Sequence, residues 1–299
     1  MLAAVCICLT VVSACSKREA EAPRKIHQET QLVIGLIPEH HIFDQIQRYK
    51  PLADYLSARI GSKIKLKVLP RYGNIIDNFI SESMDGAFFG SFTYALAHAK
   101  MGVEVLARPE RSDGVSTYYG LIFVRKDSGI RTVQDMKGKR FAFVDKATTA
   151  GYLLPLGYFP KHGVRNYKAF LKEVYFTGTH EDAINDVLNK KADIGAAKNT
   201  VYERIAKEND RITKELLVLE KSLRVPENSL AVRKDLDESL KKKLKETLLA
   251  MHDDPEGKKV LSVFGARRFI ETTDNDYAPV LDYAKEVGLN LSTYDYMNH

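Results

Sequence analysis

Cysteine is scarce in this chain of 299 residues, and the three that occur, Cys6, Cys8 and Cys15, lie at its very beginning. After Cys15 there is no thiol, so neither a disulfide framework nor a cysteine-ligated zinc site is expected in the folded part. Long apolar runs are also missing, since no stretch of about 18 apolar residues could span a membrane as a helix. The 44% of hydrophobic residues is ordinary for a globular protein with a buried core.

Charge of one sign is not in large excess either. Lys and Arg number 45 against 39 Asp and Glu, which gives a formal net charge of +6. The basic residues are scattered, and the run KKKLK at 241–245 alternates with leucines as the polar face of a helix does. We therefore expect no nucleic-acid partner and only a weak general attraction for anions.

The first fifteen residues, MLAAVCICLTVVSAC, form an apolar run that is typical of a secretory signal, expected to cover residues 1–14. The run ends in Val-Ser-Ala-Cys, which resembles the lipobox of bacterial lipoproteins, where the cysteine is lipidated and becomes the new N-terminus. We expect the same of Cys15. No Lys or Arg precedes the apolar run, which leaves open an uncleaved anchor or a different start. Residues 15–30 are mostly charged and polar, as in a flexible tether.

From residue 32 onward, short apolar runs alternate with longer amphipathic segments, a pattern that predicts parallel α/β layers with helices on both faces. Two such blocks of similar size follow each other and predict two lobes. We expect residues 31–118 plus 228–299 in lobe 1 and residues 119–227 in lobe 2. The segments STYYGLIFV (116–124) and ENSLAVRK (227–234) are the candidates for the two crossings between the lobes.

Several helix ends are marked by their residues. Pro51 fits the first turn of a helix over 51–60, and Thr179 fits the cap of a helix with Asp182 three positions on. Asp254 followed by proline predicts another helix start. The last part of the chain is expected to be mainly helical, with helices over about 236–252 and 277–287.

The stretch DKATTAG (145–151) lies between a strand-like run and a helix-like run. The first N–H groups of a helix have no partner within the helix, so such a turn favours anions. Thr148 and Thr149 offer two hydroxyl donors, and Gly151 would let an anion approach the backbone. No Lys stands at a P-loop position, so nucleotide hydrolysis is not expected. The plainer alternative is that one threonine only caps the helix.

Other candidate ligand-binding residues follow predicted strands, because the carboxyl ends of strands face the crevice in doubly wound sheets. On lobe 2, His180 stands at the start of a helix, and Asn199 follows ADIGAA. On lobe 1, Tyr72 and Tyr94 follow two strands, and Tyr119 lies at the expected hinge. The phenol O–H group of tyrosine and the imidazole N–H group of histidine can donate hydrogen bonds to oxyanions. Each of these residues also fits an ordinary core, rim or capping role.

Catalytic and metal-binding patterns are weak. His40 and His41 in PEHHIFD are adjacent and point in different directions, and no H-E-x-x-H occurs. No nucleophile–base pair or G-x-S-x-G is present. We therefore expect no metal, no cofactor and no catalytic residue.

Four stretches, taken in order, carry a resemblance to a known family: YKPLADYL with IGSKIKLKVL, MDGAFFGSFTYALAHAK, IRTVQDMKGKRFAFVDKATTAGYLLP, and FTGTHEDAINDVLNKKADIGAA. Over residues 32–285 the chain resembles the periplasmic phosphonate/phosphite/phosphate-binding proteins of ABC importers. The resemblance implies a type II periplasmic-binding fold, in which two doubly wound α/β lobes are joined by two crossover strands around a cleft.

The resemblance also implies site residues and a cellular role. It maps the oxyanion site onto six positions: Tyr72, Tyr94, Thr148, Thr149, Ala150 and His180. The family often has a hydroxyl residue where Ala150 stands, so one donor is missing here. The chain would be a monomer, lipid-anchored on the periplasmic side of the envelope, that serves an ABC permease in the inner membrane. A sensor that feeds a signalling receptor and an enzyme of the same fold are the alternatives.

Overall fold

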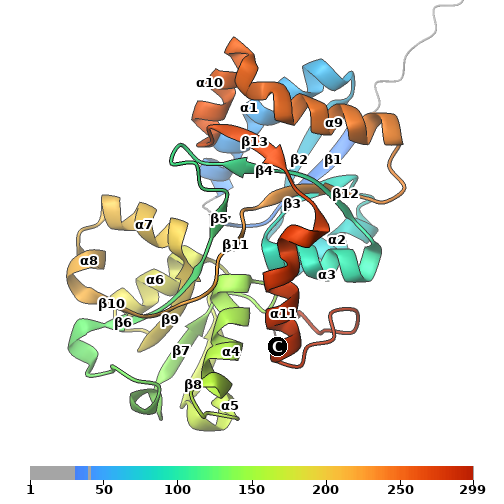
Figure 1. Cartoon of the computed structure of the whole chain (residues 1–299). Coiled ribbons are helices and arrows are strands. Elements are labelled where there is room, and N and C mark those ends of the chain that lie inside the picture. The colour runs from blue at the N-terminus through green and yellow to red at the C-terminus, as the bar shows by residue number, and fades with distance from the viewer. Residues whose placement is uncertain (1–30, 40–41, 299) are drawn as a thin grey trace, which may run out of the picture.

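The computed structural model describes residues 31–39 and 42–298, which form two α/β lobes with two strands passing between them (Figure 1). The first lobe is built on a six-stranded sheet. In spatial order its strands are β13 (Arg268–Glu271), β4 (Glu104–Glu110), β12 (Ser229–Val232), β3 (Gly86–Phe89), β1 (Gln31–Leu36) and β2 (Lys63–Val68).

Helices cover both faces of this sheet because its central strands are apolar on both sides. Phe88 and Phe89, neighbours on β3, point into two different cores. One core lies under α1 (Ile42–Ile60), α9 (Glu238–Ala250) and α10 (Pro255–Phe264). The other lies under α2 (Asn74–Ser81), α3 (Ser91–Met101) and α11 (Ala278–Glu286).

The second lobe has a five-stranded sheet with the order β10 (Leu216–Lys221), β6 (Gly120–Arg125), β9 (Ile194–Lys198), β7 (Arg140–Phe143) and β8 (Glu173–Phe176). On one face pack the π-helical turn Thr149–Leu153, α4 (Leu154–Lys161) and α5 (Tyr167–Phe170). On the other face pack α6 (His180–Leu188), α7 (Asn199–Glu208) and α8 (Arg211–Glu215).

The sheets are mixed, and the expectation of parallel layers was wrong for about half of the pairings. β1 pairs in parallel with β2 and β3, and β7 with β8 and β9. β12, β4 and β13 run antiparallel to their neighbours, as do β6 and β10 in the second lobe. These antiparallel neighbours lie far apart in the sequence: β4 and β12 are separated by the whole second lobe, and β6 and β10 by most of it. They are therefore not consecutive strand–helix–strand units, which are the units that give parallel pairs.

Two short strands connect the lobes. β5 (Thr117–Tyr118) and β11 (Val225–Pro226) pair with each other in antiparallel fashion, with Tyr118 opposite Val225. The first crossing lies within 116–124, as expected. The second lies just before 227–234, and most of that segment forms β12 inside the first lobe.

Helix α1 begins well before Pro51, so the prediction that Pro51 opens a helix was wrong. Proline inside a helix removes one backbone hydrogen bond and costs roughly 3 kcal/mol. The helix continues because its apolar face is buried: the Tyr49 ring lies 5.0 Å from that of Phe88 and 5.1 Å from that of Phe264, edge to face. Burial of several such side chains, each about 1.5–3 kcal/mol, outweighs the lost bond.

Other helix ends match the sequence. The Thr179 side chain accepts a hydrogen bond from the Asp182 N–H, and Asp254 caps α10 in the same way, with Pro255 as its first residue. α9 and α11 lie where the last helices were predicted. The strand β13 between them was not predicted.

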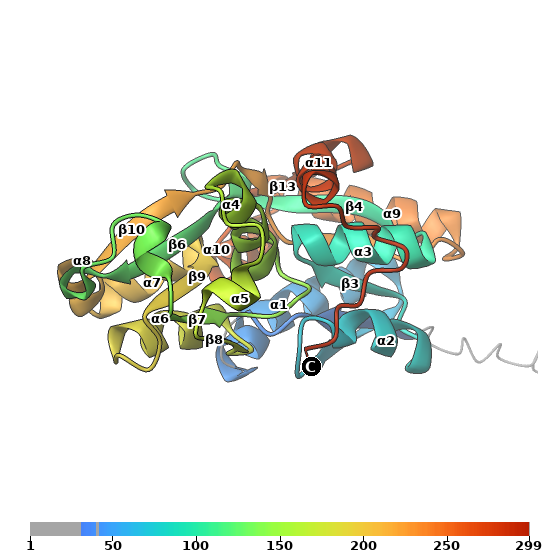
Figure 2. The same cartoon turned by 90° about the horizontal axis from the view of Figure 1, so that it is seen from below.

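The C-terminal segment after α11 lies along both lobes (Figure 2). The Tyr294 hydroxyl donates to the carbonyl of Lys146 in the second lobe at 3.0 Å, and the Tyr296 hydroxyl donates to Asp77 in the first lobe at 2.6 Å. At the other end of the chain, the predicted signal, Cys15 and the tether lie outside the described residues. Within the described ranges, no helix is long and apolar enough to cross a membrane.

Candidate functional site

A small, narrow cavity of about 10 Å³ lies between the lobes, beside the two crossing strands. Its walls come from loops that follow strands of both sheets and from β5. They consist of Ile37, Glu39, Tyr72, Gly90, Phe92, Thr93, Tyr118, Ala147, Thr148, Thr149, His180, Lys198 and Asn228. The structure thus brings together four of the predicted residues, Tyr72, Thr148, Thr149 and His180.

The loop DKATTAG forms a tight turn that ends in a helix start. The Thr148 hydroxyl donates to the carbonyl of Asp145 at 2.7 Å, and an Asp145 carboxylate oxygen accepts from the Ala147 N–H at 2.9 Å. Thr148 is extended, and the next residues form a π-helical turn that continues into α4. Such turns often occur at functional sites. Thr148 therefore stabilises the turn itself, and its side chain makes no capping hydrogen bond, so the helix-cap role considered for it was wrong.

Thr149 links the lobes and has its hydroxyl hydrogen available. Its oxygen accepts from the Phe92 N–H at 3.0 Å and from the Tyr118 hydroxyl at 3.0 Å. Phe92 belongs to the first lobe and Tyr118 to a crossing strand. A threonine hydroxyl has one hydrogen and two lone pairs, so both contacts use its acceptor capacity. The remaining hydrogen can be donated to a ligand oxygen.

Gly151 has a packing role instead of the predicted role in anion approach. A Cβ atom at this position would lie 2.4 Å from the Cβ of Val144. The glycine therefore lets the helix start pack directly on the residue that follows β7. This close packing holds Thr148 and Thr149 at the end of the sheet.

His180 is the first residue of α6, where the Thr179 cap fixes the helix start. It is buried, and its Nδ1 accepts the backbone N–H of Lys198 at 3.3 Å. A neutral imidazole that accepts at Nδ1 carries its hydrogen on Nε2. The contact with β9 thus sets the orientation of the His180 ring and places the donor atom at Nε2.

Tyr72 contributes a buried hydroxyl that has no hydrogen-bond partner among residues 31–39 and 42–298. The residue is buried, and its ring meets that of His180 edge to face with 5.8 Å between centroids. Burial, aided by the negative charge of Glu39, raises the pKa of Tyr72 well above 10. The phenol thus keeps its proton. An unpaired buried donor costs free energy, and a bound acceptor would remove that cost.

Tyr94 does not line the cavity. It is buried in the first lobe, where its hydroxyl donates to Asp274 and its ring packs on Tyr277 with 4.2 Å between centroids. The residue on α3 was expected in the cleft because it follows β3. The cavity instead meets the beginning of the helix, Phe92 and Thr93.

Tyr119, Asn199 and Ala150 also lie outside the cavity lining. Tyr119 is half-buried and points away to Glu203, and its neighbour Tyr118 lines the cavity instead. The Asn199 side chain accepts the Tyr119 N–H at 2.9 Å, which ties α7 to the crossing strand. Ala150 packs against β6: a Cβ on Gly120 would lie 3.1 Å from the Cβ of Ala150.

Sequence reasoning missed three polar residues of the cavity, Lys198, Glu39 and Asn228, together with the adjacent Glu227. Lys198 is the last residue of β9, so the rule that placed His180 and Asn199 at strand ends applied to it as well. Lys198 is nevertheless nearly inaccessible to solvent, at 3% exposure. Its partners Glu39 and Glu227 are far away in the sequence, and no spacing indicates the pairing.

No group of three or more His, Cys, Asp and Glu side chains that could hold a metal was found in the described part of the chain. His40 and His41, the histidines considered for a metal, fall outside that part. The described cavity offers hydroxyl and imidazole donors, which suit an anion.

Two α/β lobes, two crossing strands and a cavity between the lobes that is lined by polar side chains define a two-lobed ligand-binding protein. Residues 34–277 match the family model described as "ABC transporter, phosphonate, periplasmic substrate-binding protein". The chain belongs to this family.

Individual relatives in sequence and in structure are consistent with this family assignment. The phosphonates-binding periplasmic protein of Escherichia coli K12 is 26% identical over 262 residues, which cover 86% of this chain and 77% of that protein. The binding component of a phosphonate ABC transporter from Pseudomonas aeruginosa is similar in structure, with a TM-score of 0.76, 26% identity and 85% of each chain covered. PhnD1 of Prochlorococcus marinus in complex with methylphosphonate has the same fold, with a TM-score of 0.75, 22% identity, and 87% and 98% of the two chains covered.

Proposed function

We propose that this protein captures a small phosphorus oxyanion (a phosphonate, phosphite or phosphate) in the cavity between its lobes and delivers it to an ABC permease. The observation that carries the proposal is the unpaired, buried hydroxyl of Tyr72 in the cavity wall. A protein interior pairs nearly all of its buried polar groups, and an exception indicates a missing partner. A phosphoryl oxygen is a partner of the right kind.

The donors come from both sides of the cavity. Tyr72 belongs to the first lobe, and Thr149 and His180 belong to the second. The N–H groups at the helix start after Thr148 add further donors and the positive end of a helix dipole. An oxyanion that contacts both sides binds the closed arrangement better than an open one. Its binding therefore shifts the lobes towards closure.

Calorimetric titration with methylphosphonate, phosphite and phosphate tests this function. His180→Asn keeps an acceptor near Nδ1 for the Lys198 N–H but removes the donor at Nε2. His180→Gln keeps a donor near the position of Nε2. We expect the asparagine variant to lose on the order of 10-fold or more in affinity and the glutamine variant to lose less. Wild-type protein that binds none of the three anions would contradict the proposal.

We infer that the bound anion is released unchanged. The cavity contains hydroxyl, imidazole and ammonium groups but no nucleophile with an adjacent base that we can identify. Phosphorus NMR of methylphosphonate incubated with the protein should show no product. A role as a sensor would require a signalling receptor that binds the closed form of the protein. Binding of the closed form by a permease would favour transport.

The anchoring of the protein is also part of the proposal. The sequence Val-Ser-Ala-Cys supports lipidation of Cys15 on the periplasmic side of a membrane. The wild-type chain produced in a bacterium should incorporate a labelled fatty acid and remain with membranes. Cys15→Ser should do neither. We further expect the folded part to act as a monomer, which sedimentation of residues 31–299 would measure.

A further inference from the structure

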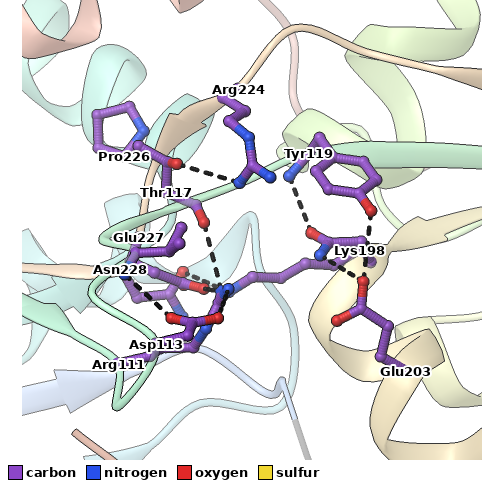
Figure 3. A network of polar contacts seen from close by, with 12 residues as sticks. Arg111, Asp113, Thr117, Tyr119, Lys198, Glu203, Arg224, Pro226, Glu227 and Asn228 are labelled. Atoms are coloured by element: carbon purple, nitrogen blue, oxygen red, sulfur yellow. Dashed lines mark hydrogen bonds and ion pairs between the residues drawn. The ribbon is translucent and has the colours of Figure 1, made fainter. Parts of the chain in front are cut away.

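One wall of the cavity holds a buried lysine between two buried glutamates. The Lys198 ammonium donates to Glu39 at 2.5 Å and to Glu227 at 2.6 Å, and all three residues are buried. Figure 3 shows the Lys198 side chain extending from β9 to Glu227 and Asn228. The lysine belongs to the second lobe, whereas Glu39 follows β1 and Glu227 follows β11.

The remaining oxygens of these glutamates also have partners. The second oxygen of Glu39 accepts from Asn228 at 2.9 Å, and the second oxygen of Glu227 lies 3.7 Å from the Arg111 guanidinium. Burial alone would lower the pKa of Lys198, but the negative charges of Glu227 and Glu39 raise it by more than burial lowers it. The ammonium therefore stays charged. The Tyr118 ring lies beneath it, 4.3 Å from Nζ.

This wall is part of the same cavity as the oxyanion donors. Glu39, Lys198 and Asn228 line it together with Tyr72 and His180. The backbone of Lys198 itself donates to the His180 ring. A ligand held by Tyr72 and His180 would therefore lie beside a wall whose carboxylates already bind a cation.

We propose that Lys198 makes this cavity selective for phosphorus oxyanions that carry no ammonium group. The inference rests on the proposed function and names the ligand class more narrowly. An aminoalkyl phosphonate would need a carboxylate for its ammonium group. Lys198 already binds the carboxylates of both Glu39 and Glu227. The ligand ammonium would meet a like charge in a nearly dry site, where repulsion is only weakly screened.

Titration with methylphosphonate and 2-aminoethylphosphonate tests the selectivity. Wild-type protein should bind methylphosphonate at least about 10-fold more tightly than the amine. Lys198→Met keeps the apolar stem and removes the charge, which leaves two buried carboxylates available to a ligand ammonium. In this variant the preference should shrink by about 10-fold or reverse.

Lys241→Met is a matched control. Lys241 is also buried, and its ammonium donates to Glu104 and Glu238 at 2.7 Å each, but it lies on α9 away from the cavity. Loss of this ammonium should leave both affinities unchanged. A second variant that combines Lys198→Met with Glu39→Gln and Glu227→Gln should lose the gained affinity for the amine.

Different results separate the failure of this inference from the failure of the proposed function. If wild-type protein binds neither compound, nor phosphite or phosphate, the proposed function fails. If it binds methylphosphonate and 2-aminoethylphosphonate equally well, the inference is overturned while the function stands. This comparison of the two affinities of wild-type protein tests the inference even if Lys198→Met does not fold. A folded Lys198→Met that keeps the wild-type preference also overturns the inference.

Discussion

The cavity has two walls that differ in how their polar groups are paired. On the wall with Tyr72 and Thr149, donors remain available: the Tyr72 hydroxyl has no partner among the described residues, and Thr149 uses only its acceptor side. On the wall with Lys198, the charged groups satisfy one another across the lobes. Buried polar groups thus serve two ends: on one wall they supply donors for the proposed ligand, and on the other they hold the two lobes together.

The largest effect is expected from Thr149→Val. The change removes the donated hydrogen bond and also leaves the Phe92 N–H and the Tyr118 hydroxyl without an acceptor. A hydrogen bond to a charged group contributes roughly 1.5–3 kcal/mol, so calorimetry should show affinity for methylphosphonate lower by about 10- to 150-fold. Thr149→Ser keeps the hydroxyl and should stay close to wild type. Equal losses in both variants would remove Thr149 from the ligand-binding wall.

Tyr72→Phe should separate binding from stability. The phenylalanine fills the same space without a hydroxyl, so affinity should fall by about 10-fold. The free energy of unfolding of the ligand-free protein should stay the same or rise, because an unpaired buried hydroxyl is removed. Denaturant titration measures this. A marked loss of stability would mean that the hydroxyl is paired in the folded protein.

Tyr94→Phe should give the opposite pattern and serves as the matched control. The Tyr94 hydroxyl donates to Asp274 and lies outside the cavity lining. Loss of this bond should lower the free energy of unfolding by about 1 kcal/mol and leave the affinity unchanged. A clear loss of affinity would show that α3 reaches the ligand, as the sequence suggested.

The smallest effect on ligand binding is expected from alkaline pH, which acts on the stability of the folded protein as a whole. Burial raises the pKa of Tyr49 to about 12, whereas an unfolded tyrosine titrates near 10. Between these values the unfolded chain binds fewer protons, so stability falls as pH rises from about 10 to 12. Below pH 10 the contribution is fully present. Tyr49→Phe should flatten this part of the curve in denaturant titrations at several pH values.

The fold was predictable wherever a residue pattern repeats locally. The strand–helix alternation and caps such as Thr179 and Asp254 identified most elements and the two lobes. β13 was not predicted, because four residues form a strand only through pairing with β4, which lies far away in the sequence. The length of α1 was missed because the burial of Tyr49 outweighs a proline that ends most helices.

The candidate site was predictable to the extent that strand ends define it. This rule placed Thr149, His180 and Tyr72 at one cavity. It also selected Tyr94 and Asn199, whose side chains turn to partners inside one lobe or to the crossing strand. The Lys198 contacts depend on lobe closure, which no local pattern encodes.

The C-terminal segment has a consequence for the residence time of a ligand. Two paired strands at one side would let the lobes swing apart freely, but Tyr294 and Tyr296 fasten the second lobe and the first lobe to one continuous piece of chain. Asn298 adds contacts to the loop that carries Thr149: it donates to Asp145 and accepts from Lys146. If the lobes can open only after this segment has detached, the contacts of Tyr294, Tyr296 and Asn298 control how fast the ligand dissociates, although they do not touch it.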